Sequence, residues 1–112
     1  MAYTEIDTDS LFARMFGAAR EDSRDIWSSI RGVVKVELKS VARKIKEAGK
    51  GVAAGDITEE HARLLMRLER AQIATVIAAT TAVTLPAAER AVGSALEAAR
   101  ESVNGALGFY LL

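Results

Sequence analysis

A run of eighteen consecutive residues without a charge places the strongest constraint on how this chain can fold. It extends from Ala71 to Ala88 and consists of small and apolar residues with four threonines, Gln72 and Pro86. A helix without a charged face is covered by other helices or lies in lipid. Because about 18 residues only just span a bilayer, and threonine hydroxyls can bond within a buried helix, we expect a covered helix inside a helical protein.

The rest of the chain also has helical periodicity, and it predicts an all-α fold. Apolar residues recur every three or four positions over residues 8–49, 57–85 and 87–104. Ser23 interrupts the first of these segments, so residues 8–21 are expected either to begin a long helix or to form a separate piece of it.

Glycines mark the boundary between the first two predicted helices. Gly49, Gly51 and Gly55 can end a helix, and Thr58 can cap the next one. Since a short connection makes successive helices antiparallel, the sequence predicts a long helical hairpin followed by a shorter C-terminal helix. A chain of 112 residues is expected to form one domain over residues 1–112.

The amount of apolar sequence predicts self-association. Half of the residues are hydrophobic, and the C-terminal GALGFYLL would be an exposed apolar tail unless it docked on this chain or on a neighbour. We therefore expect an oligomeric helical bundle, a homo-oligomer of two or more chains, and possible binding of another protein. The residues predicted to form the oligomer interface are Trp27, Ile30, Val34, Val41, Leu65, Leu68, Val76, Ile77, Val92 and Phe109.

Two carboxylates suggest an alternative function as a ferritin-like metal-binding bundle. Glu37 lies in the apolar stretch VVKVELKSV, and a hairpin that turns near residue 53 would bring it towards Glu69. Facing glutamates are the ligands of carboxylate-bridged metal sites in helical bundles, which also use histidine. The only histidine, His61, lies about two turns from Glu69, so we favour instead an ion pair between Glu37 and Arg67 or Arg70.

Basic residues form a stripe along the first predicted helix, which suggests a second alternative. Lys35, Lys39, Arg43 and Lys46 follow one another at helical spacing and could contact a nucleic-acid backbone. No aromatic residues alternate with them in the sequence, so stacking on bases is not indicated. Nucleic-acid binding is therefore expected less than a solvated face that meets acidic groups.

The composition limits the remaining functional classes. Fifteen basic and fifteen acidic residues give no net charge, and the absence of cysteine excludes disulfides and thiolate chemistry. The sequence shows no phosphate-binding loop and no nucleophile paired with a base, so we expect neither an enzyme nor a cofactor. MAYTEIDTDS lacks a secretory pattern, and a cytoplasmic structural or protein-interaction module is the leading prediction, with a small pore-forming or lysis-type membrane protein as an alternative.

Overall fold

Helices make up nearly all of the chain. The computed structural model describes residues 3–112, and within them the backbone forms four α-helices and one short 3₁₀ turn, without any strand. The predicted all-α class is confirmed. The elements in chain order are α1 (Thr8–Asp22), η1 (Arg24–Ile26), α2 (Trp27–Ala53), α3 (Glu59–Thr80) and α4 (Leu85–Leu107).

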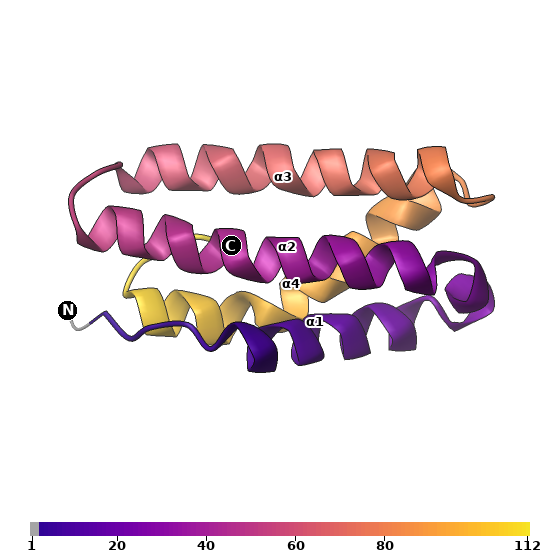
Figure 1. Ribbon diagram of the computed structural model, residues 1–112, viewed down its shortest axis with the longest axis horizontal. Helices are drawn as coiled ribbons and strands as arrows, with labels where there is room; N and C mark the ends of the chain where they lie inside the picture. The colour runs from indigo at the N-terminus through magenta and orange to yellow at the C-terminus, as the bar shows by residue number, and fades with distance from the viewer. Residues whose placement is uncertain (1–2) are drawn as a thin grey trace.

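Consecutive helices run in opposite directions and lie next to one another (Figure 1). α1 packs mainly on α2 and α4, and α3 packs on the same two helices. The arrangement is therefore an up-down-up-down four-helix bundle, in which α1 and α3 do not share a large contact.

Of the two expectations for residues 8–21, a separate piece is confirmed and a single helix over residues 8–49 is wrong, because the chain breaks at Ser23. This residue leaves helical geometry at φ −126° and ψ 33°, and its backbone N–H donates to the carbonyl oxygens of Ala19 and Arg20. The 3₁₀ turn then reverses the chain before α2 begins at Trp27. The apolar spacing continues through the break because α1 and α2 both face the same core, so the spacing alone does not reveal two helices.

The glycine cluster ends α2 later than predicted. α2 continues through Gly49 and Gly51 to Ala53, and only Gly55, at φ 78°, adopts the left-handed conformation that the turn requires. The N–H groups of Asp56 and Ile57 both donate to the carbonyl oxygen of Gly51 and so hold the connection to α3.

The uncharged run does not form one helix. α3 ends at Thr80, and Thr84 caps α4 by accepting a hydrogen bond from the N–H of Ala87 at 3.3 Å. Pro86 is the second residue of α4, where its missing N–H has no intrahelical partner to lose. The C-terminal helix is also not the shorter one, since α4 has 23 residues and α3 has 22.

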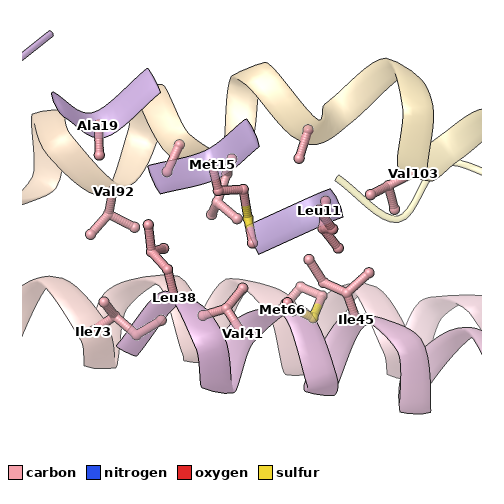
Figure 2. Close-up of a cluster of buried hydrophobic side chains, with 14 of the residues drawn as sticks. Leu11, Met15, Ala19, Leu38, Val41, Ile45, Met66, Ile73, Val92 and Val103 are labelled. Carbon is pink, nitrogen blue, oxygen red and sulfur yellow. The ribbon is translucent and has the colours of Figure 1, made fainter. Parts of the chain in front are cut away.

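One hydrophobic cluster joins all four helices. Figure 2 shows Met15 of α1 pointing between α4 and α2, with Leu38 and Val41 on α2 and Val92 on α4 nearby. The extended N-terminal segment adds Ile6 to this core, and its Thr4 N–H donates to the carbonyl oxygen of Ala106.

The apolar C-terminal tail docks on its own chain. This is one of the two predicted arrangements, the other being docking on a neighbouring chain. The side-chain oxygen of Asn104 accepts from the N–H groups of Leu111 and Leu112, and its amide donates to the carbonyl oxygen of Leu112. Leu111 is buried in the core as a result.

Candidate interaction surface

α3 uses only one side of its surface for the core. The buried residues on this helix are Ala62, Met66, Ile73, Ala74 and Ile77. At 100° per residue they occupy one side of the helix, and the opposite side receives no cover from α2 or α4. The exposed residues on that opposite side, called here the outer α3 face, are His61, Leu64, Leu65, Leu68, Ala71, Gln72, Thr75 and Ala79.

The N-terminal half of the outer α3 face is strongly apolar. The exposed fractions are 48% for Leu64, 44% for Leu65 and 59% for Leu68, and the face carries no Asp, Glu, Lys or Arg. Among residues 3–112, the other large apolar side chains that are exposed are Val36, Leu85 and Tyr110, on three different elements. Three leucines within two helical turns therefore form the densest exposed apolar cluster on the described surface.

Charged residues border this face along both edges. On the edge towards α2, Lys44 Nζ donates to both carboxylate oxygens of Glu69, at 2.9 and 2.8 Å. On the edge towards α4 lie Glu60 and Arg67, both exposed. A charged border around an apolar centre is typical of surfaces that bind other proteins.

The ten predicted interface residues differ in burial and fall into three groups. Ile30, Val34, Val41, Ile77 and Val92 are buried in the core of a single chain, so they are not available to a partner of the folded bundle. Trp27, Val76 and Phe109 are half-buried, and Leu65 and Leu68 are exposed.

The run around Ile77 needs less cover than the sequence predicts. Cover on every side is expected there, but Gln72, Thr75 and Ala79 face outward. Small and hydroxylated side chains tolerate exposure, and the hydroxyl of Thr75 is satisfied because it donates to the carbonyl oxygen of Ala71 at 3.0 Å. The leucines that lack cover lie about three turns before Ile77.

Leu64, Glu60 and Arg67 are not among the predicted interface residues. Leu64 lies four positions before Leu68, a spacing that places both on one face and was visible in the sequence. What the sequence does not show is that Ala62 and Met66, rather than the leucines, point into the core.

The predicted carboxylate pair does not form a metal site. Glu69 is held by Lys44, and Glu37 lies seven residues before Lys44 on α2, which is about 10 Å along the helix axis. In the described part of the chain, no three His, Cys, Asp or Glu side chains are grouped so as to hold a metal ion. The alternative ion pair of Glu37 with Arg67 or Arg70 is not made either, since both arginines line the groove between α3 and α4.

The basic stripe is partly neutralised within the chain. Lys46 Nζ lies 3.0 Å from a carboxylate oxygen of Glu5 in the N-terminal segment. This hydrogen-bonded pair lowers the pKa of Glu5 and raises the pKa of Lys46. Lys35, Lys39 and Arg43 remain exposed, so their predicted role in nucleic-acid binding stays a prediction.

Aromatic side chains lie closer to this stripe than the sequence indicates. Phe12 stacks on Phe16 with ring centroids 5.2 Å apart, and Phe16 meets Trp27 edge to face at 5.0 Å. Lys39 Nζ is 5.6 Å from the centroid of the Phe12 ring, a cation–π distance. The spacing of the sequence does not reveal that these aromatic rings lie beside the basic stripe. Phe12 and Phe16 come from α1, and in one long helix over residues 8–49 they would lie far from Lys39 along the helix axis.

A groove between α3 and α4 lies next to the outer α3 face. It has a volume of about 260 Å³ and is lined by Met66 and Leu96, the C-terminal residues 110–112, Glu97 and four arginines. Arg63 donates to the carbonyl oxygen of Tyr110 at 3.0 Å and so fastens the tail along the groove. Guanidinium groups stay protonated in proteins, so the four arginines can bind anions but cannot act as general bases.

Comparisons of the chain with protein-family models, with curated proteins and with solved structures give no match. Among residues 3–112, none of the helices combines the length and the hydropathy that crossing a membrane requires. Any functional inference therefore depends on the residues of this chain.

Proposed function

We propose that this protein is a non-catalytic helical module that binds a second copy of itself through the outer α3 face. One observation carries the proposal: Leu64, Leu65 and Leu68 are about half exposed on a helix face that has no charged residue. Exposed apolar clusters with a polar border mark interaction sites more often than they mark inert surface.

The size of the cluster indicates a reversible association. Removing the exposed part of each leucine from water contributes on the order of 1 kcal/mol, and a symmetrical dimer buries six of them. Association itself costs several kcal/mol in lost rotational and translational freedom. The leucines alone therefore only offset the cost of association, so burial of the rest of the outer α3 face has to supply the remaining free energy, and we expect a weak, reversible dimer.

The proposal is tested by introducing a charge into the leucine cluster. Leu68→Glu is expected to convert the protein to a monomer in sedimentation or multi-angle light scattering at a concentration at which the wild-type protein dimerises, because the interface would then bury an unpaired carboxylate. The fold should persist, since Leu68 is 59% exposed.

Val36→Glu is the matched control. Val36 is 65% exposed on α2 and lies outside the outer α3 face, so the same substitution there should leave the association unchanged. A wild-type protein that stays monomeric over the whole concentration range would refute self-association. Equal loss of association in both variants would refute the assignment to α3.

A further inference from the structure

Two opposite charges border the outer α3 face along the same edge. Glu60 and Arg67 are seven residues apart, which is about two turns, so they point to the same side of α3. Within the described residues, neither takes part in a salt bridge, whereas the neighbouring Arg63 and Glu59 pair with each other at 3.8 Å. On the opposite edge, Glu69 is already engaged by Lys44.

Symmetry decides which groups these two charges can meet. When two identical helices pack face to face around a two-fold axis perpendicular to both, they run antiparallel, and each edge of one helix lies against the same edge of the other. The edge that carries Glu60 and Arg67 therefore faces its own copy. If the axis passes between residues 63 and 64, Glu60 lies opposite Arg67 of the second copy, and the reverse pair forms by symmetry.

We propose that the partner of the outer α3 face is a second copy of the chain in antiparallel alignment, with Leu64 at the two-fold axis and two Glu60–Arg67 ion pairs between the copies. The proposal rests on the proposed function and adds its register and direction. It brings Leu64 and Leu65 of both copies together at the axis, and Leu68 of each copy lies about 7 Å further along its helix. Sliding the helices by seven residues moves the axis next to Arg67 and places this residue against its own copy, which is repulsive.

Charge reversal tests the two ion pairs. Glu60→Arg and Arg67→Glu should each weaken dimerisation roughly tenfold, since each variant creates two like-charge contacts per dimer. The double variant Glu60→Arg with Arg67→Glu should return the dissociation constant to within roughly threefold of the wild-type value, because it exchanges the partners. Glu89→Arg, an exposed acid near the start of α4, is the control for the change in net charge.

Single cysteines test the direction independently, because the chain contains no native cysteine. In the antiparallel dimer, two copies of Leu64→Cys lie close enough to form a disulfide under mild oxidation. Two copies of Ala79→Cys lie about 45 Å apart along the helix axes and should not cross-link. A parallel dimer would cross-link at both positions.

Each outcome separates this arrangement from the proposed function. If Leu68→Glu abolishes association but the charge reversals change nothing, or if Ala79→Cys cross-links as well as Leu64→Cys, the protein still self-associates and the proposed register is overturned. A double reversal that is weaker than both single reversals also overturns the ion pairs. Absence of any wild-type dimer overturns both proposals.

Discussion

At the scale of single residues, Gly49 shows how a residue that suggests a turn can serve packing instead. The position is buried inside α2, and a Cβ placed there would collide with the side chain of Leu107 on α4 and touch the ring of Tyr3. The missing side chain therefore lets α2, the end of α4 and the N-terminal segment approach closely. Helix propensity opposes glycine here, so the close approach is the reason that a glycine fits this position.

Gly49→Ala should lower the free energy of unfolding by about 1–3 kcal/mol, because the added methyl group overpacks a buried contact. Gly32→Ala is the matched control: this glycine is also inside α2, but nothing lies within 4 Å of an added Cβ. The control should stabilise the helix by roughly 0.5–1 kcal/mol. Urea unfolding followed by circular dichroism measures both, and equal effects would contradict the packing role of Gly49.

At the scale of elements, the junction of α1 and α2 depends on a small residue at its corner. Ser23 is fully buried, and its hydroxyl oxygen has no hydrogen-bond partner. It ends α1 and precedes the 3₁₀ turn, so its backbone position is set by the reversal of the chain. A small residue occupies position 23 because the corner is fully buried, and not because its hydroxyl makes a hydrogen bond.

Ser23→Ala is expected to raise the free energy of unfolding by roughly 1 kcal/mol, because it removes a buried polar group that has no partner. Ser23→Val should lower it, since valine replaces the hydroxyl with a methyl group and adds a second one at a fully buried corner. Thermal or urea unfolding of the two variants provides the measurement. A clear loss of stability in Ser23→Ala would contradict this account and would indicate that the hydroxyl makes a bond through water.

The outer α3 face also belongs to the element scale. α3 contributes Ala62, Met66, Ile73, Ala74 and Ile77 to the core, and it contacts two helices on one side only. The leucines of the outer α3 face lie on the other side and are therefore free for another chain. A helix that carries apolar residues on both sides can serve the bundle and an interface simultaneously, and this is the physical basis of the proposed self-association.

At the scale of the whole molecule, α1 holds the bundle together more than its length suggests. It packs on both α2 and α4, and its Met15 is fully buried between them. Since the same cluster contains residues from α3 and from the C-terminal tail, the four helices share one core. We expect them to unfold in one cooperative transition.

Met15→Asp should therefore abolish the cooperative transition of the entire bundle, because burying an unpaired carboxylate costs more free energy than the folding stability of a domain of this size. Ala13→Asp, on the exposed side of α1, is the control and should retain a sharp transition. Thermal unfolding by circular dichroism and binding of a hydrophobic dye distinguish the two. Retention of a cooperative transition by Met15→Asp would show that α1 is a detachable arm.

The sequence by itself determined the features that depend on near neighbours along the chain. The helical spacing, the turn at the glycine cluster and the cap before α3 follow from local geometry, and the absence of charge in residues 71–88 indicated that helix packing dominates the fold. The long helix over residues 8–49 was wrong because spacing continues across the corner at Ser23. Local sequence shows periodicity, but it does not show a reversal between two helices that face one core.

Only the tertiary structure decided which side of each helix is inside. α3 has apolar residues on two sides, so their spacing alone does not identify which side faces the core. The choice of Ala62 and Met66 over Leu64 and Leu68 depends on where α2 and α4 contact α3, which local sequence does not show. The same packing places Lys44 of α2 opposite Glu69 of α3. Glu69 therefore pairs with Lys44 and not with Glu37, and the predicted metal pair does not form.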